Sequence, residues 1–216
     1  MNDTLQIACI VSAGFQQNTF VAQLLPRTDC LVLDPGLEPE KTIAYLDEHG
    51  LAPAAILNTH GHADHIGGNR ALKERWPECP LVIGRADAAK LVDPNWNLSA
   101  AFGFSVVSPP ADVQVDQGDR YSAAGFDLEV LAIPGHSPGH VAYLWRGQEP
   151  YIAFVGDIIF RGGIGRTDFP DGDHEQLLAG IRAKLYTLPD ATRLLPGHGP
   201  ATTVGHEKRT NPFVRE

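Results

Sequence analysis

Short apolar segments rich in β-branched residues recur along most of the chain, separated by turn-forming stretches such as residues 12–14 and 26–29. A run of four to eight such residues between turn signals is typical of a β-strand. The pattern therefore predicts strands at residues 5–11, 18–25, 30–33, 54–58, 81–83, 126–133, 141–145, 151–155 and 193–195.

Three other segments have the spacing of apolar residues, or the end signals, of a helix. Residues 39–49 end at Gly50, a residue suited to the position after a helix, and residues 63–75 form the second predicted helix. The third is expected to begin after Asp173, a good N-cap, and to continue to about residue 188.

The remaining sequence is less regular. Between residues 93 and 110, aromatic residues and prolines without a clear period predict a long ordered loop, and the tail from residue 201 is polar. The hydrophobic fraction of 43% with 20% charged residues is ordinary for a globular protein and excludes wholesale disorder. Because no linker or repeat interrupts the pattern, we expect a single domain over residues 1–216.

Composition also excludes several classes of partner. The formal charge of −9, without a basic stripe, argues against a nucleic-acid partner. No apolar run has membrane-spanning length and the N-terminus has no secretory signal, so we expect no membrane partner and a cytoplasmic location. The three cysteines are odd in number and lack C-x-x-C spacing, which predicts reduced thiols and no sulfur-ligated metal.

Candidate chemistry is concentrated in the segment Thr-His-Gly-His-Ala-Asp-His-Ile-Gly-Gly at residues 59–68. Three histidines and one aspartate fall within six positions there: His60, His62, Asp64 and His65. Imidazole nitrogen and carboxylate oxygen are the ligands preferred by zinc and similar divalent ions. The cluster therefore predicts a metal site, and the alternative is a polar loop with solvated histidines.

Further candidate ligands follow other predicted strands. His136, Asp157 and His198, like His60, each lie just past the C-terminal end of a buried strand, in a loop that contains Gly or Pro. Strand ends on one rim of a sheet can hold side chains from distant sequence positions in a fixed constellation. We therefore expect these four side chains to converge on one site.

The loops that carry these residues resemble the signatures of the metallo-β-lactamase superfamily, in the family's order. The matching sequences are Asp-Pro-Gly at 34–36, the cluster at 59–68, Pro-Gly-His-Ser-Pro-Gly-His at 134–140, Gly-Asp at 156–157 and Pro-Gly-His-Gly at 196–199. The resemblance implies an α/β fold, a four-layer αβ/βα sandwich in which two mixed β-sheets are flanked by helices.

The resemblance also divides the candidate ligands between two divalent ions that share a carboxylate. One ion would be held by His60, His62 and His136, the other by Asp64, His65 and His198, with Asp157 bridging both. Two sets of three protein ligands leave open coordination positions, which is typical of a catalytic site.

The implied nucleophile is a hydroxide held between the ions, with Asp64 and Asp157 as the catalytic carboxylates. Zinc is the first expectation for the two ions, and iron or manganese suits the same ligands. Asp34 would orient the histidine loop, and His140 is expected to be a hydrogen-bonded structural histidine.

Within the superfamily, the chain is similar to the glyoxalase II branch. The similarity rests on residues 59–68, 156–160 and 163–166, and on a tail at 205–213 like that of short bacterial members, which lack a C-terminal helical domain. The resemblance implies hydrolysis of S-D-lactoylglutathione to D-lactate and glutathione, a step of methylglyoxal detoxification. The expected partner is thus a small glutathione-linked thioester, and a monomer is the simplest expectation for the oligomeric state.

Substrate contacts are expected from basic residues. Long glyoxalase II enzymes place a lysine against the glutathione carboxylate, and Arg166 occupies that position here. Its guanidinium suits a carboxylate. Lys208 and Arg209 in the tail are expected to compensate for contacts made by the missing helical domain.

Other functions stay open at this point. A persulfide dioxygenase has the same fold, uses one iron held by two His and one Asp, and resembles the Gly-Arg-Thr-Asp-Phe sequence at 165–169. A hydrolase of another ester or thioester and a non-catalytic metal-binding protein are further alternatives. β-Lactam hydrolysis is disfavoured because secreted lactamases carry export signals, and a nuclease would require a basic surface.

Overall fold

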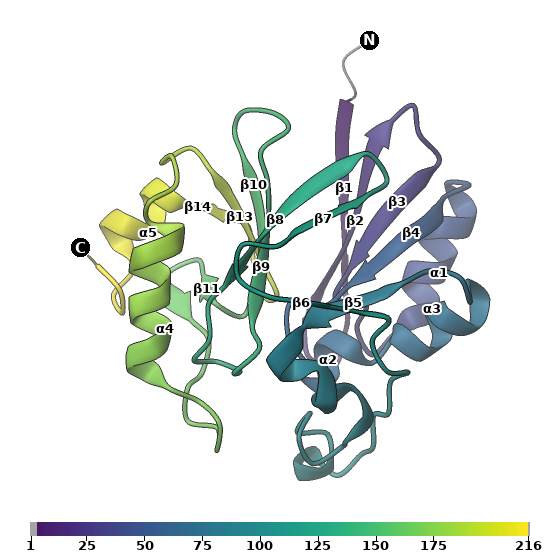
Figure 1. Cartoon of the computed structure of the whole chain (residues 1–216), viewed down its shortest axis with the longest axis horizontal. Helices are drawn as coiled ribbons and strands as arrows, with labels where there is room; N and C mark the ends of the chain where they lie inside the picture. The colour runs from purple at the N-terminus through teal and green to yellow at the C-terminus, as the bar shows by residue number, and fades with distance from the viewer. Residues whose placement is uncertain (1–3, 216) are drawn as a thin grey trace.

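Two six-stranded sheets pack face to face in the computed structural model, which describes residues 4–215 (Figure 1). The first sheet has the order β1-β2-β3-β4-β5-β6, antiparallel from β1 to β3 and parallel from β3 to β6. Its strands are β1 (Thr4–Val11), β2 (Asn18–Leu25), β3 (Asp29–Leu33), β4 (Ala52–Leu57), β5 (Leu81–Gly84) and β6 (Val113–Val115).

The second sheet has the order β14-β13-β10-β9-β8-β7, in which only the pair β10 and β13 is parallel. Its strands are β7 (Arg120–Ala123), β8 (Phe126–Ala132), β9 (Val141–Trp145), β10 (Ile152–Gly156), β13 (Arg193–Pro196) and β14 (Thr202–Thr203). A separate two-stranded ribbon joins β11 (Ile159–Phe160) to β12 (Gly163–Ile164). Both large sheets are therefore mixed.

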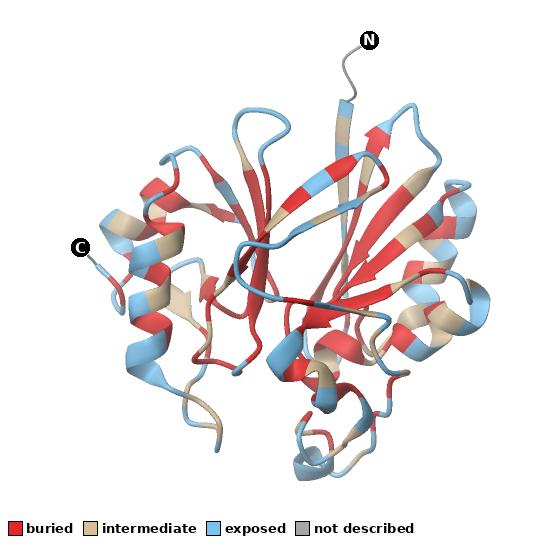
Figure 2. Cartoon of the chain, viewed as in Figure 1, coloured by how far each residue is buried: buried red, intermediate tan, exposed pale blue. Residues whose placement is uncertain are grey.

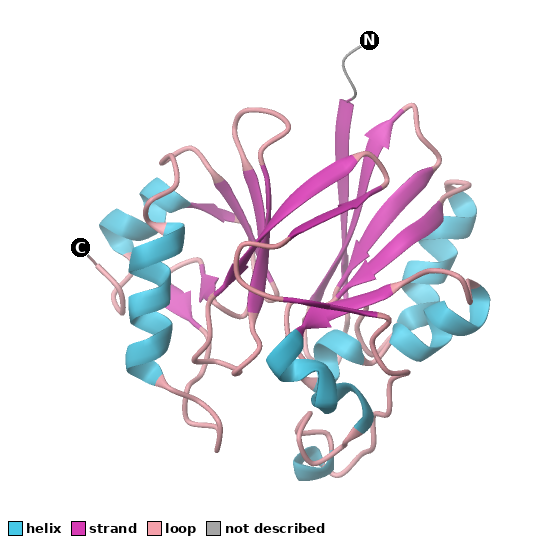
Figure 3. Cartoon of the chain, in the orientation of Figure 1, coloured by secondary structure: helices cyan, strands magenta, loops and turns pink. Residues whose placement is uncertain are grey.

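Helices cover the outer faces of the two sheets and complete four layers (Figure 3). The helical segments that connect strands of the first sheet are α1 (Pro39–Glu48), α2 (Ala63–Ile66), α3 (Asn69–Arg75) and the 3₁₀ segments η1 (Arg85–Val92) and η2 (Ala100–Phe102). The second carries α4 (His174–Gly180), continued by the π-helical η3 (Ile181–Leu185), and α5 (Val204–Thr210). Within residues 4–215 no helix is long and apolar enough to cross a membrane.

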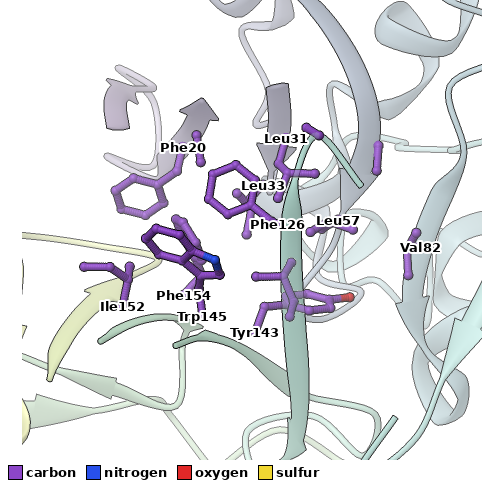
Figure 4. Packing of buried hydrophobic residues seen from close by; sticks show 14 of the residues in the cluster. Phe20, Leu31, Leu33, Leu57, Val82, Phe126, Tyr143, Trp145, Ile152 and Phe154 are labelled. Atoms are coloured by element: carbon purple, nitrogen blue, oxygen red, sulfur yellow. The ribbon is translucent and has the colours of Figure 1, made fainter. Parts of the chain in front are cut away.

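The main core lies between the sheets, where aromatic side chains from both inner faces meet (Figure 4). Phe20 of β2 approaches Phe154 of β10 at 5.8 Å between ring centroids, and Phe126 packs edge-on against Trp145 at 5.2 Å. Two further apolar clusters seal the helices against the outer faces, so central strands such as β3, β5, β9 and β10 are buried on both sides, whereas β1 and β7 at the edges are not (Figure 2). This burial of both faces explains why most strands read as continuous apolar runs.

The nine predicted strands are all present, with ends shifted by a few residues at most. Five short strands were missed, β6, β7, β11, β12 and β14, because two to four residues are too few to show a period. The third predicted helix begins as expected: the Asp173 carboxylate accepts a hydrogen bond from the backbone N–H of Gln176 at 2.9 Å. Residues 93–110 form a loop with one 3₁₀ turn.

The prediction of one helix over residues 63–75 is wrong, because α2 and α3 are separate helices. The backbone N–H of Gly68 donates to the carbonyl of Pro35 at 2.8 Å, and not to the carbonyl of Asp64 four residues earlier. A side chain at Gly68 would also approach the carbonyl oxygen of Gly36 within 2.8 Å. The Asp-Pro-Gly loop therefore interrupts the helix by packing against it.

The tail is also more ordered than its polar sequence suggests. It forms β14 and α5, and the carboxylate of Glu207 is fully buried there. That carboxylate accepts hydrogen bonds from Thr202 Oγ1, from the backbone N–H of Gly162 at 3.0 Å and from Asn211 Nδ2 at 2.9 Å. A polar side chain can thus belong to the interior when its hydrogen bonds are all made.

Candidate metal centre

Four strands bring the predicted ligands together at one rim of the molecule. His60 follows β4, His136 follows β8, Asp157 follows β10 and His198 follows β13, each just past the C-terminal end of its strand. The ligand atoms of these residues and of their neighbours in the loop after β4 lie within 4.8 Å of one another in three overlapping groups. The convergence expected from the strand ends is therefore present.

The first predicted ligand set forms one of these groups. The Nε2 atoms of His60 and His136 are 3.3 Å apart, and the ring of His62 lies 4.6 Å, between centroids, from each of these two rings. All three imidazoles are buried. Three imidazoles facing one another at this separation leave room for a common ligated ion and for little else.

The second predicted set forms another group, and Asp157 lies between the two. His198 Nε2 is 3.2 Å and His65 Nε2 is 3.7 Å from Asp64 Oδ2. Asp157 Oδ1 lies 3.3 Å from His65 Nε2, while its Oδ2 lies 3.6 Å from both His136 Nε2 and His198 Nε2. One carboxylate thus faces ligands of both sets.

Hydrogen bonds on the far side of the rings orient the histidines. The Nδ1–H of His65 donates to the carboxylate of Asp34 at 3.1 Å. His136 donates in the same way to the carbonyl of Arg166 at 2.8 Å, and His198 to the carbonyl of Phe15 at 3.1 Å. In a neutral ring, an acceptor at Nδ1 keeps the proton there and leaves the Nε2 lone pair directed at the cluster, as is usual for metal-binding histidines.

Unpaired buried atoms test whether divalent ions fit these residues. His62 Nε2, His65 Nε2 and Asp157 Oδ1 are buried and make no hydrogen bond of good geometry, although the last two atoms lie 3.3 Å apart. In proteins, buried polar atoms are almost always paired, because an unmade bond costs about 1–3 kcal/mol. All three atoms point into the cluster and are metal ligand types, so two divalent ions fit the donor set.

The electrostatics of the cluster agree with this fit. Burial lowers the pKa of His60 and His62 well below the ordinary value, so both rings are neutral at pH 7. Burial acts the same way on His65, but the nearby carboxylates of Asp157 and Asp64 outweigh it and raise the pKa of His65 well above the ordinary value. The two carboxylates thus stabilise positive charge at this end of the cluster, which is what a divalent ion supplies.

The two supporting residues predicted from the sequence are where they were expected. Asp34 accepts hydrogen bonds from the backbone N–H and the hydroxyl of Thr59, both at 2.7 Å, in addition to the one from His65. His140 is fully buried, stacks on His60 at 4.5 Å and accepts the backbone N–H of Asp157 at 3.0 Å. It is thus a hydrogen-bonded structural histidine, as predicted.

Comparison with known proteins decides the family. The metallo-beta-lactamase superfamily model matches residues 13–198. The chain belongs to this superfamily. A probable metallo-hydrolase of Bacillus subtilis (strain 168), YqgX, is 42% identical over 192 residues, 88% of this chain and 90% of the relative. Hydroxyacylglutathione hydrolase GloC of Haemophilus influenzae is 37% identical over 213 residues, 97% and 98% of the two chains.

Solved structures agree with the assignment. The B3 metallo-beta-lactamase BLEG-1 superposes with a TM-score of 0.92 at 35% identity, covering 98% of this chain and all of the other. TTHA1623 in a di-iron-bound form superposes with a TM-score of 0.81 at 37% identity, covering 95% and 99%. The predicted superfamily and the predicted four-layer sandwich are confirmed.

One buried carboxylate of this superfamily domain was missed in the sequence. Asp87, in η1, is fully buried and accepts three hydrogen bonds. The donors are the backbone N–H of Gly61 at 2.8 Å, the hydroxyl of Ser137 at 2.6 Å and the backbone N–H of Gly139 at 2.7 Å. Because Gly61 lies between His60 and His62, Asp87 ties the loops that carry all three ligands of the first set.

A buried lysine was also missed. Lys90 is 1% exposed, and its ammonium pairs with the carboxylate of Asp171 at 2.6 Å. Its aliphatic stem packs on Gly61, where an added Cβ would lie 2.6 Å from Lys90 Cβ. The pair joins η1 to the loop that carries Arg166 and Phe169 beside the cluster.

A cavity of about 280 Å³ opens beside both ligand sets. Its walls are mainly aromatic, from Phe15, Phe102, Phe104, Phe160 and Phe169. A larger hollow of about 880 Å³, lined by Leu24, Arg120 and Trp145 among others, has none of the ligands among its described lining residues. The smaller cavity is therefore the candidate substrate site, because it holds the chemistry.

The three predicted substrate contacts are divided by the structure. Arg166 lines the cavity, where it forms two hydrogen bonds with Asp168 at 2.9 and 2.8 Å and lies 4.7 Å over the ring of Phe169. Lys208 and Arg209 are not brought there. Both lie on α5, outside the cavity lining, and pair with Asp190 at 3.2 and 3.6 Å. The α5 helix covers the outer face of the second sheet, which keeps these two residues away from the site.

Proposed function

We propose that the protein is a metal-dependent thioester hydrolase whose substrate is a hydroxyacylglutathione such as S-D-lactoylglutathione. The observation that carries the proposal is the sharing of Asp157 between two ligand sets beside a cavity. Open positions next to two sets of three protein ligands favour chemistry over a purely structural ion. This argues against the alternative of a non-catalytic metal-binding protein.

The choice of thioester rests on the relatives and on the cavity. Hydroxyacylglutathione hydrolase GloC matches nearly the whole chain. Arg166 offers a guanidinium at the cavity, and guanidinium groups suit the carboxylates that glutathione carries. To bind substrate, Arg166 would exchange its exposed pairing with Asp168, which is worth little because both side chains are solvated.

The geometry of the cluster supports a separate role for each ligand set and for Asp157. Two divalent ions, when bound, supply a water of lowered pKa and a Lewis acid for the developing oxyanion. His60, His62 and His136 would hold one of them, and Asp64, His65 and His198 the other. Asp157 faces both sets and would fix their separation. Thiolate is a good leaving group, so the chain needs no further acid to protonate it.

We further propose zinc as the resident metal, with iron and manganese as the alternatives. Imidazole and carboxylate ligands accept all three ions, and selection among them depends on availability as well as on ligand type. The di-iron form of TTHA1623, at 37% identity, keeps iron in consideration. Metal analysis of the purified protein distinguishes these ions directly.

The decisive experiment is steady-state hydrolysis of S-D-lactoylglutathione, with the released thiol measured and the metal content determined on the same preparation. We expect turnover that is lost on chelation and restored by zinc. Oxygen uptake with glutathione persulfide, faster than thioester cleavage, would favour the dioxygenase and sink the hydrolase proposal. A chromogenic β-lactam should be assayed as a third compound, because the B3 metallo-beta-lactamase BLEG-1 is similar to this chain. Preferential β-lactam cleavage would overturn the thioester assignment.

A further inference from the structure

Three phenylalanines form one continuous wall of the cavity. Phe15 comes from the loop between β1 and β2, whereas Phe102 ends η2 and Phe104 follows it. The ring centroids of Phe15 and Phe102 are 5.8 Å apart, those of Phe15 and Phe104 are 6.1 Å apart, and those of Phe102 and Phe104 are 6.5 Å apart. We call these three residues the aromatic wall.

The aromatic wall is more exposed to solvent than is usual for large apolar side chains. Phe15 is 37% and Phe102 55% exposed, although each ring is large and apolar. Contiguous apolar surface of this kind, next to a polar site, marks a place where a ligand or partner is bound. Because all three rings line the same cavity as the metal ligands, the occupant of that cavity is what would cover them.

Hydrogen bonds hold the aromatic wall in place. The buried side chain of Asn97 donates to the carbonyls of Lys90 and Val106 at 3.1 and 2.9 Å and accepts the hydroxyl of Ser99 at 2.7 Å. On the other loop, the carbonyl of Phe15 accepts the Nδ1–H of His198 at 3.1 Å. The exposed rings are therefore positioned by buried polar contacts and by a predicted ligand.

Charge divides the cavity into two ends. Apart from histidines, Arg166 is the one basic residue among the described residues that line the cavity. Its guanidinium stacks on the ring of Phe169. The ring of Phe169 lies 5.1 Å from His62 and 5.7 Å from His136, so this end belongs to the first ligand set. The aromatic wall is joined to His198, at the second set, and no lysine or arginine lines the cavity there.

We infer that the aromatic wall binds the acyl group of the thioester, and that the preferred acyl group is larger and less polar than lactoyl. The inference rests on the proposed thioester function. The carboxylates of glutathione match the Arg166 end, which leaves the acyl group at the wall. A lactoyl group has a single methyl to place against three rings, whereas an alkyl or aryl acyl group would cover them.

The test uses S-methyl-, S-butyl- and S-hexylglutathione, thioethers that carry an alkyl chain in place of the acyl group and are not hydrolysed. Their dissociation constants are measured by calorimetry on the zinc-loaded protein. We expect affinity to rise along the series, by about tenfold from methyl to hexyl, since each buried methylene adds to binding and only one side of the chain is covered. Equal affinities across the series, or no binding at millimolar concentration, would overturn the inference.

Variants assign the effect to the aromatic wall. Phe102→Ala should remove most of the tenfold difference, and Phe102→Leu should retain most of it, because leucine keeps an apolar surface. Phe213 is the matched control: it is 54% exposed but does not line the cavity, so Phe213→Ala should leave the series unchanged. A gap between methyl and hexyl that survives in Phe102→Ala would contradict the assignment.

Turnover separates this inference from the proposed function. The kcat/KM for S-hexanoylglutathione should exceed that for S-D-lactoylglutathione, and Phe102→Ala should reverse the order through KM. If no thioester is cleaved while the thioether series is still graded, the proposed function fails and the apolar site stands. If thioesters are cleaved but neither affinity nor kcat/KM depends on chain length, the inference fails and the proposed function stands.

Discussion

Replacing Asp87 should weaken both the fold and the first ligand set. Its carboxylate accepts three hydrogen bonds in a fully buried place, from the backbone N–H groups of Gly61 and Gly139 and the hydroxyl of Ser137. Alanine would leave three buried donors without an acceptor. These donors lie on the loops that carry His60, His62 and His136, so the loss acts on the ligands as well as on stability.

The magnitude follows from the number of unpaired groups. Each buried donor without a partner costs about 1–3 kcal/mol, and such costs are not additive when the groups can relax together. We expect Asp87→Ala to lose about 4 kcal/mol of unfolding free energy, a large part of the roughly 5–15 kcal/mol that a domain has. Asp87→Asn retains one oxygen but presents an amide group to a neighbouring donor, so a loss of about 2 kcal/mol is expected.

The assay has two parts, both independent of substrate. Urea unfolding of chelator-treated protein, followed by circular dichroism, gives the stability of the chain alone. Competition with a chromophoric chelator gives the affinity for zinc, which should fall by about 10–100-fold for one ion and by less for the other. Ser137→Ala is the matched control, because it removes one donor and leaves none unpaired, and it should cost about 1 kcal/mol.

An Asp87→Asn protein that unfolds within about 0.5 kcal/mol of the parent and binds zinc equally well would refute both expectations. Such a result would mean that the two loops hold their shape without the shared carboxylate. A loss of stability with unchanged zinc affinity would refute only the second half, and would make Asp87 a residue of the fold alone.

Three further predictions follow from other buried groups. Asp157→Asn should abolish the proposed thioester turnover while leaving the circular dichroism spectrum intact; unchanged hydrolysis would contradict its position between the ligand sets. Asp171→Asn leaves the buried ammonium of Lys90 unpaired and should lower the free energy of unfolding by about 2 kcal/mol or more; the double variant with Lys90→Met should recover most of that loss. Thermal unfolding measures both variants, and a double variant as unstable as the single one would count against the importance of the ion pair. Burial raises the pKa of Cys30 to about 12, so at pH 8 a thiol reagent should modify the exposed Cys9 much faster, as peptide mapping would show; equal rates would contradict the burial.

The predicted ligands could be found from the sequence because two independent signals coincide. His60, His62, Asp64 and His65 are close in the chain, and the other three each follow a buried strand. The position of a strand end in space is set by the sheet alone, so a residue placed there can be located without a detailed structure. Both signals survive small errors in strand boundaries.

Asp87 and Lys90 could not be found in this way. Both lie in the eight-residue 3₁₀ segment η1, with no metal-ligand spacing or repeat around them. Their importance comes from burial and from partners that are distant in sequence, 50 positions for Ser137 and 81 for Asp171. Sequence pattern reads a charged residue as solvated by default, and only tertiary contacts reveal the exception.

Glu207 is a third buried charged residue that the sequence pattern did not predict, here in the tail of the fold. A carboxylate normally marks an exposed position, and the tail reads as polar for that reason. Here its oxygens are used by Thr202, Gly162 and Asn211, which turns a polar tail into part of the interior. The failure of the pattern is thus specific: it misses buried polar groups whose hydrogen bonds are satisfied.

The loop after β4 owes its shape to its place in the first sheet. Strand β4 lies between β3 and β5, and all three are parallel, so the segments that follow them emerge at the same rim. The segment after β3 supplies Asp34, which binds Thr59, and the segment after β5 supplies Asp87, which binds Gly61. His60 lies between these two anchored residues.

This arrangement assigns a different carboxylate to each ligand set. Asp34 also holds His65 of the second set, whereas Asp87 also holds the loop of His136 in the first. Asp34→Asn should therefore weaken mainly the binding of a metal ion by the second set and Asp87→Asn mainly the binding by the first, although both residues support the same short loop. If the two variants lost the same ion, the loop would be a single rigid unit, and the separation of the site into two independently supported halves would be wrong.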